Sequence, residues 1–252
     1  MKQWINRITW ALLFYFIFLI VTLPAYLLVS RIPLDKSIEL GNVTGTVWSG
    51  SVDAIRIDQT IIKDVSWTVD FTQLIAAKIA VDLEFGNPRK ILEPQGKAQL
   101  QYGLNGPSVR DLRVKLPADL IVQQVDMPFK AEASGLVEAN IAEARLGQPV
   151  CHTLDGQVNW KLAAVTYMDT NYTYGDVKAS LSCDENGALV SKITGNPELL
   201  TLDIDAKLTT YQNYSIEGFI SPGSNASKQM RSALSFLGNT DNQGRYYIKF
   251  TQ

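Results

Sequence analysis

Few side chains in this 252-residue sequence have the types and spacing that chemistry would need. Cys151 is followed by His152, and a thiolate beside an imidazole is the pair that cysteine nucleophiles use. Neighbouring positions of a strand point to opposite faces, so this pair is poorly placed for a hydrogen bond. Asp203 and Asp205 share one strand face, but they alternate with apolar residues, which is typical of a solvated face rather than an acid–base pair. We therefore expect no catalytic residue.

The composition also argues against metal, cofactor and nucleic-acid sites. One histidine and two cysteines cannot supply the four ligands of a structural Cys/His zinc site. No glycine-rich phosphate loop and no G-x-S-x-G turn occurs in the sequence. The 23 basic residues are balanced by 25 acidic ones, whereas a nucleic-acid surface needs a basic excess. We expect a protein that is not an enzyme and that binds no cofactor, metal or nucleic acid.

The N-terminal segment differs from the rest of the chain because residues 8–30 contain no charged side chain. A helix of roughly 20 apolar residues crosses a hydrocarbon layer, so this segment is predicted to be a single transmembrane signal anchor. A cleavable signal peptide, cut after Ala25, is the alternative. Lys2 and Arg7 favour a cytoplasmic position for residues 1–7. Residues 31–252 would then form one domain on the outer side of the membrane.

The two cysteines, Cys151 and Cys183, both fall in this outer domain. An even number of cysteines in an exported domain indicates a disulfide, and we favour that pairing. Two buried free thiols are the alternative, because cysteine is among the most buried residue types.

From residue 45 onward the dominant pattern is period-2 alternation of apolar and polar residues, as in 65–71, 79–85, 158–162, 177–183 and 202–208. Short turn sequences between these segments favour antiparallel neighbours. We predict a mainly β domain built from a large, curled antiparallel sheet, either a trough, a sandwich or an open barrel. Short helices are expected near Leu120-Ile121 and, close to the C-terminus, over 227–237. Two subdomains with a boundary near 147–155 are possible, but one domain is favoured.

Three sequence segments together resemble one known family. They are the anchor end 23–25 (LPA) with residues 45–51 (GTVWSGS), residues 144–151 (ARLGQPVC) with 154–160 (LDGQVNW), and the near-terminal pair 233–238 (ALSFLG) and 244–246 (GRY). In this order and spacing the chain resembles type II secretion system protein N. The structural positions of the motif, with Trp67 added, are Gly45, Trp48, Gly50, Trp67, Asp155, Gly156, Trp160, Gly238, Gly244 and Tyr246.

The resemblance implies an accessory component of the general secretion pathway in a Gram-negative bacterium. It would sit in the cell inner membrane as a single-pass protein, with the bulk of the chain periplasmic. Its partners would be other inner-membrane components of the type II secretion system, especially the one contacting the secretin. The alternative is a membrane-tethered β-trough that binds lipid on its apolar face. The alternation of apolar and polar residues does not tell whether the apolar face of the sheet is packed against other residues or open to a ligand.

Overall fold

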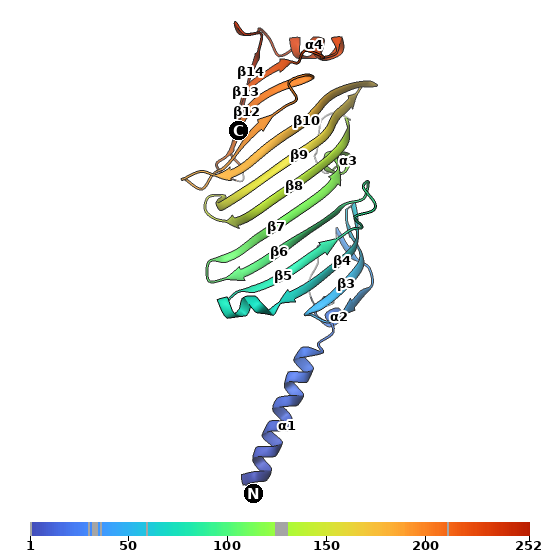
Figure 1. Cartoon of the computed structure of the whole chain (residues 1–252), viewed down its shortest axis with the longest axis vertical. Coiled ribbons are helices and arrows are strands. Elements are labelled where there is room, and N and C mark those ends of the chain that lie inside the picture. Colours follow the sequence, from blue (N-terminus) through green and yellow to red (C-terminus); the bar gives the residue numbers. More distant parts are fainter. Residues whose placement is uncertain are drawn as a thin grey trace.

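The computed structural model describes residues 2–29, 31, 35, 37–58, 60–123, 131–210 and 212–252. Most of these residues form one tall, twisted sheet, with helix α1 projecting from one end and helix α4 lying at the other (Figure 1). The helical elements are α1 (Lys2–Val21), α2 (Ala25–Val29), the 3-10 helix η1 (Phe71–Ala76), α3 (Ala118–Val122) and α4 (Lys228–Ser235).

The sheet has 14 antiparallel strands in a continuous meander. Its order is β1-β3-β4-β5 and so on through β14, and β2 also pairs with β3. The strands are β1 (Ile38–Leu40), β2 (Val43–Gly45), β3 (Ser49–Ile57), β4 (Thr60–Asp70), β5 (Ile79–Phe85), β6 (Gln95–Gly103), β7 (Gly106–Pro117), β8 (Glu132–Leu146), β9 (Cys151–Tyr167), β10 (Thr170–Cys183), β11 (Leu189–Thr194), β12 (Leu200–Leu208), β13 (Tyr214–Pro222) and β14 (Tyr246–Thr251).

The predicted mainly β fold with a short C-terminal helix is confirmed, and the sheet is open. β1 and β14 lie at opposite ends of the strand order and do not pair with each other. The sheet continues through residues 147–155, where β8 and β9 pair along most of their length. Both sides of the predicted subdomain boundary therefore belong to the same sheet.

The N-terminal helix differs from the single span predicted over residues 8–30. Helix α1 ends at Val21, and a separate five-residue helix, α2, begins at Ala25. The physical reason is Pro24, which has no main-chain N–H and instead forms a β-bridge with Thr46. Among the helices of the described residues, none combines the length and the apolar character needed to cross a bilayer.

The predicted strand over 65–71 needs a correction at its end. β4 stops at Asp70, and Phe71 begins the 3-10 helix η1. The carboxylate of Asp70 accepts hydrogen bonds from the main-chain N–H and the hydroxyl of Thr72, at 2.9 and 2.6 Å. Such an N-cap stabilises the start of a helical turn, and alternation alone does not reveal it.

Cross-strand pairing divides the sheet into two unlike surfaces, because residues paired across antiparallel strands lie on the same face. The first, called here the apolar face, carries aligned apolar residues on nearly every strand. Examples from β4 to β9 are Val69, Val81, Leu100, Val109, Ala144 and Leu154, and examples from β9 to β14 are Val158, Ala179, Ile193, Ile204 and Ile248.

This apolar face is only partly covered. No large side chain among the described residues is fully buried, and on the apolar face Ile79, Leu100 and Tyr102 remain 53%, 41% and 63% exposed. A compact cluster forms where α4 lies on the sheet, around Leu200, Met230 and Leu234. The described residues therefore form one open sheet, on which α4 packs but no second sheet does, as a sandwich would require.

Candidate functional site

The motif over residues 45–51 lies where the N-terminal helix meets the sheet. The indole Nε1 of Trp48 donates a 2.7 Å hydrogen bond to the carbonyl oxygen of Ile20, in the last turn of α1. The main-chain N–H of Val47 donates to the carbonyl of Leu23 at 3.0 Å. Trp67, on β4, donates from its own Nε1 to the carbonyl of Val47 at 3.1 Å. The two tryptophans thus tie the end of the helix to the first long hairpin.

Glycine at position 50 permits this arrangement. Gly50 pairs with Trp67 across β3 and β4, and a Cβ at Gly50 would lie 2.4 Å from a ring carbon of Trp67. That distance is far shorter than any van der Waals contact, so a side chain there would displace the indole. Gly45 has a φ of +86°, a conformation that residues with a side chain rarely adopt. Both glycines therefore hold geometric positions in the junction.

Trp160, on the interior strand β9, belongs to a second aromatic group. Its Nε1 donates to the carbonyl of Ser134 at 2.9 Å, and its ring lies edge-on to Tyr174 with centroids 6.3 Å apart. Burial raises the pKa of the Tyr174 hydroxyl above its usual value. Tyr246 packs against the cluster of Leu200 and its neighbours. Two of the predicted motif positions, Trp160 and Tyr246, thus border the region beneath α4.

The apolar face holds two hollows. The larger one has a volume of about 860 Å³ and lies between α4 and strands β9, β10, β12 and β13. The second, of about 510 Å³, lies over β5, β6, β7, β8 and β9, near the disulfide. Volumes of this size are typical of sites for small organic molecules. Alternation predicted the apolar face but gave no sign of either hollow, because each depends on how neighbouring strands curve.

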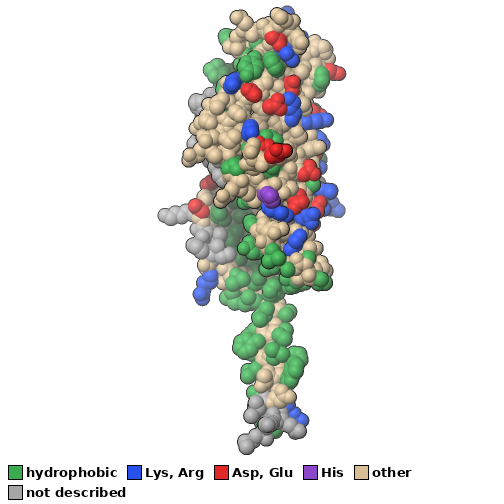
Figure 2. All heavy atoms as spheres, turned by 90° about the vertical axis from the view of Figure 1, so that its left-hand side faces the viewer, with side chains coloured by type: hydrophobic (Ala, Val, Ile, Leu, Met, Phe, Trp, Pro, Cys, Tyr) green, Lys and Arg blue, Asp and Glu red, His purple; other side chains and the backbone are tan. Residues whose placement is uncertain are grey.

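The opposite surface, called here the charged face, carries ion pairs that bridge neighbouring strands. Glu138 on β8 lies 2.8 Å from Lys161 on β9 and 3.2 Å from Lys115 on β7. The lysines hold the pKa of Glu138 below its usual value, mainly through the hydrogen bond from Lys161. Figure 2 shows acidic and basic side chains following one another along one side of the sheet, while green hydrophobic side chains cover helix α1.

The two aspartates considered for acid–base work belong to this charged face. Asp203 and Asp205 both bind the ammonium group of Lys192, at 2.5 and 2.9 Å. These contacts raise the pKa of Lys192, with the hydrogen bond to Asp203 as the largest cause. Carboxylates that share one lysine stabilise the sheet surface and give no pair with separated acid and base roles.

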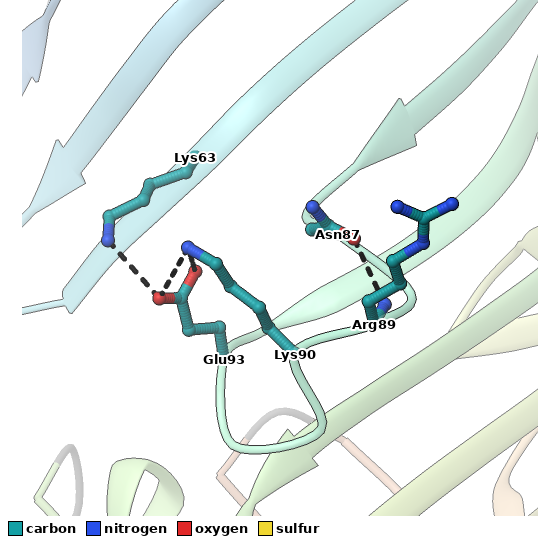
Figure 3. A network of polar contacts seen from close by, with 5 residues as sticks. All are labelled: Lys63, Asn87, Arg89, Lys90 and Glu93. Carbon is teal, nitrogen blue, oxygen red and sulfur yellow. Dashed lines mark hydrogen bonds and ion pairs between the residues drawn. The ribbon is translucent and has the colours of Figure 1, made fainter.

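One long loop is also fastened to the charged face. The connection between β5 and β6 reaches across to Lys63 on β4, where the carboxylate of Glu93 lies 3.3 Å from Lys63 and 3.2 Å from Lys90 (Figure 3). At the start of the loop the side chain of Asn87 accepts a hydrogen bond from the N–H of Arg89 at 3.0 Å (Figure 3). Both contacts are exposed, and they shape the loop without forming a reactive cleft.

The cysteines form the predicted disulfide, Cys151–Cys183. It joins the start of β9 to the end of β10, and the N–H of Cys151 donates to the carbonyl of Gly187 in the next turn at 3.0 Å. His152 is exposed and takes no part in the bond.

The remaining motif positions are spread along the sheet. Asp155 and Gly156 lie on β9 beside a small polar hollow of about 390 Å³ that Asp111 also lines. Gly238 and Gly244 have φ values of +113° and +73° in the segments around α4 and β14. Among the described residues, no group of three or more His, Cys, Asp or Glu side chains is placed to hold a metal ion. The structure thus distributes the motif positions along the sheet rather than gathering them in one pocket.

Comparison with known proteins identifies the family that the sequence resembles. The family model for type II secretion system (T2SS), protein N matches residues 36–249. Two curated proteins named type II secretion system protein N are similar along almost their whole lengths. The one from Aeromonas hydrophila is 29% identical, covering 99% of this chain and 98% of its own. The one from Vibrio cholerae serotype O1 is 25% identical, covering 90% of this chain and 89% of its own.

A third relative of that name, from Pectobacterium carotovorum, is 26% identical over 94% of this chain and 92% of its own. No solved structure matches the chain. The family's name describes a secretion component rather than an enzyme. Because the family model spans well over half of the sequence, the chain belongs to the type II secretion system protein N family.

Proposed function

We propose that the chain is an accessory scaffold of the type II secretion system in the inner membrane. Residues 1–7 lie in the cytoplasm, residues 8–30 form the membrane anchor, and residues 31–252 form a periplasmic β domain. This domain binds other inner-membrane components, especially the one contacting the secretin, during export of folded proteins. The proposal gives the chain no catalytic step. Family membership supports its place in the secretion machine.

The surface of helix α1 supports the proposed anchor. Residues 8–29 carry no charge, and large apolar side chains such as Trp10, Phe14 and Phe18 are 55%, 64% and 63% exposed. Apolar side chains on every side of a helix are unfavourable in water and favourable in lipid. The disulfide Cys151–Cys183 supports a periplasmic position, since such bonds persist in oxidising compartments.

The observation that carries the binding role is the edge of β14. Tyr214 and Gln252 exchange both main-chain hydrogen bonds, at 3.1 and 3.0 Å. In an antiparallel pair such bonded pairs alternate with unbonded ones, so the main-chain groups of Lys249 and Thr251 point away from β13. No residue that the structure describes pairs with them there. The other end of the sheet offers only β1 and β2, of three residues each.

An outward-facing strand edge can accept an extended segment of another protein through main-chain hydrogen bonds. The test is Lys249→Pro, which removes an outward N–H and no hydrogen bond to β13. Lys249→Ala is the matched control, because it deletes the same side chain and keeps the N–H. Crosslinked complexes would be captured from cells that express the rest of the secretion system.

We expect Lys249→Pro to lose the captured secretion components while Lys249→Ala retains them, with the melting temperatures of both variants within a few degrees of the original. If Lys249→Pro captures the secretion components as well as the original protein does, with an unchanged melting temperature, edge pairing is not the mode of binding.

A further inference from the structure

The larger hollow on the apolar face has the form of a binding site. Its floor consists of side chains from β9, β10, β12 and β13, including Trp160, Val177, Leu202 and Ile220, and α4 contributes Met230 and Leu234 as a wall. Met230 and Leu234 are almost fully buried, so the helix is held firmly over the strands. The volume of about 860 Å³ is large enough for a substantial part of a lipid-sized molecule.

The lining excludes a charged ligand group. None of the described residues that line it is charged, and their polar groups are tyrosine, threonine and serine hydroxyls, one glutamine amide and the indole N–H of Trp160, which is bonded to Ser134. A buried charge without a partner is strongly unfavourable, so an ionised ligand group would have to remain outside. The occupant is therefore apolar over the part that enters the hollow.

The lining also disfavours a peptide. The main-chain groups of the floor strands are paired in ladders that run from β9 through β10, β11, β12 and β13. A peptide segment brings an N–H and a C=O with every residue, and each unpaired buried group costs free energy. A hydrocarbon chain has no such groups. The chemistry of the site thus favours an acyl chain.

The rest of the molecule indicates where that chain comes from. The exposed apolar helix α1 would place the sheet beside a bilayer, and the second hollow, of about 510 Å³, lies on the same apolar face between the two ends. The basic residues of α4, Lys228 and Arg231, do not line the hollow, and the guanidinium of Arg231 donates to the carbonyls of Gly223 and Ser224 at 2.9 and 3.3 Å.

We propose that the hollow beneath α4 binds an acyl chain of a membrane phospholipid, whose headgroup stays outside the hollow. This binding is separate from the edge of β14, and it rests on the membrane anchor of the proposed function but not on the binding of secretion components. It gives the apolar face a ligand. Binding of a lipid is what distinguishes a lipid-binding trough from a sheet whose apolar face is merely exposed.

The test uses the full chain in vesicles that contain phosphatidylglycerol with a diazirine on one acyl chain. After irradiation, peptide mapping by mass spectrometry locates the adducts. We expect adducts on β9, β10 and α4 in addition to those on α1. Adducts confined to α1 would overturn the proposal. The α1 adducts serve as an internal reference for lipid access.

Ala233→Phe places a ring inside the hollow, whereas Ser235→Phe adds the same ring on α4 at a position that does not line it. We expect Ala233→Phe to reduce the adducts on β9, β10 and α4 by about tenfold, equivalent to 1.4 kcal/mol, without changing those on α1. Ser235→Phe should match the original protein. Unchanged labelling in Ala233→Phe would contradict the proposal.

Thr170→Phe, which fills the same hollow from β10, keeps the test decisive if Ala233→Phe does not fold. A parallel sample labelled with a free diazirine fatty acid identifies the source of the chain. Stronger labelling of the hollow by the free acid than by the phospholipid would overturn the phospholipid assignment.

Discussion

The indole N–H of Trp48 lies 2.7 Å from the carbonyl oxygen of Ile20 and donates a hydrogen bond to it. The last four carbonyls of a helix lack partners within the helix, so this bond satisfies a group at the end of α1 from outside. The N–H of Val47 does the same for Leu23, two residues beyond the helix. The junction is therefore a specific contact between motif and helix, and it fixes where the sheet begins relative to α1.

Replacing Trp48 with phenylalanine should loosen this junction. Trp48→Phe keeps an aromatic ring next to Phe71, whose ring centroid lies 5.4 Å away, and removes only the donor. Loss of one such hydrogen bond costs about 1 kcal/mol, which should speed amide exchange of Val47 by roughly fivefold. Hydrogen exchange followed by mass spectrometry measures this rate.

Trp160→Phe is the matched control, because Trp160 donates to Ser134 far along the sheet. Exchange at Val47 should stay the same in that variant. If Trp48→Phe also leaves the Val47 amide unchanged, the hydrogen bond to Ile20 does not hold the junction.

A methyl group at position 50 should destabilise the first hairpin. In Gly50→Ala the new Cβ would lie 2.4 Å from the Trp67 ring and 2.6 Å from the carbonyl oxygen of Thr44. Neither group can move freely, because Trp67 is hydrogen-bonded to Val47 and Thr44 belongs to β2. Overpacking of this kind costs roughly 1–3 kcal/mol in the free energy of unfolding, measured by urea titration.

The same substitution at Gly103 provides the comparison. There a Cβ would meet the flexible side chain of Lys78 at 3.0 Å, with the nearest backbone atom at 3.7 Å. Gly103→Ala should therefore cost much less than Gly50→Ala. Equal losses in the two variants would show that the Trp67 contact does not set the requirement for glycine.

The ion pairs of Glu138 should make stability depend on pH. The pKa of Glu138 lies below the ordinary glutamate value of 4.5 in the folded chain, because Lys161 and Lys115 bind the carboxylate. A carboxyl group whose pKa is lower in the folded state than in the unfolded state stabilises the protein at pH values above the unfolded-state pKa. That stabilisation is lost as the pH falls through the folded-state pKa. Glu138→Gln should therefore show a smaller drop in the urea midpoint between pH 7 and pH 4 than the original protein.

Lys161→Met offers a cross-check, since Lys161 makes the closer contact, at 2.8 Å, and is the main cause of the shift. This variant should lose part of the same pH dependence. An identical acid-side drop in the original protein and Glu138→Gln would mean that other carboxylates account for it.

Local patterns in the sequence predicted several elements well. Alternation over 79–85 coincides with β5, because one polar and one apolar face suffice to place a strand on a half-covered sheet. The helix expected over 227–237 is α4, whose start is capped by the hydroxyl of Ser227 accepting from the N–H of Met230 at 3.1 Å. The pairing of Cys151 with Cys183 followed from there being only two cysteines.

The amino-acid order by itself determined the strand-rich class, the two unlike faces, the disulfide and the family, because these depend on residue types at short spacing. Only the tertiary structure decided that the sheet stays open, that Trp48 reaches Ile20, and that a hollow forms beneath α4. Each of these depends on contacts between residues distant in the chain. Such contacts are set by the twist and curvature accumulated over many strands, which no local pattern encodes.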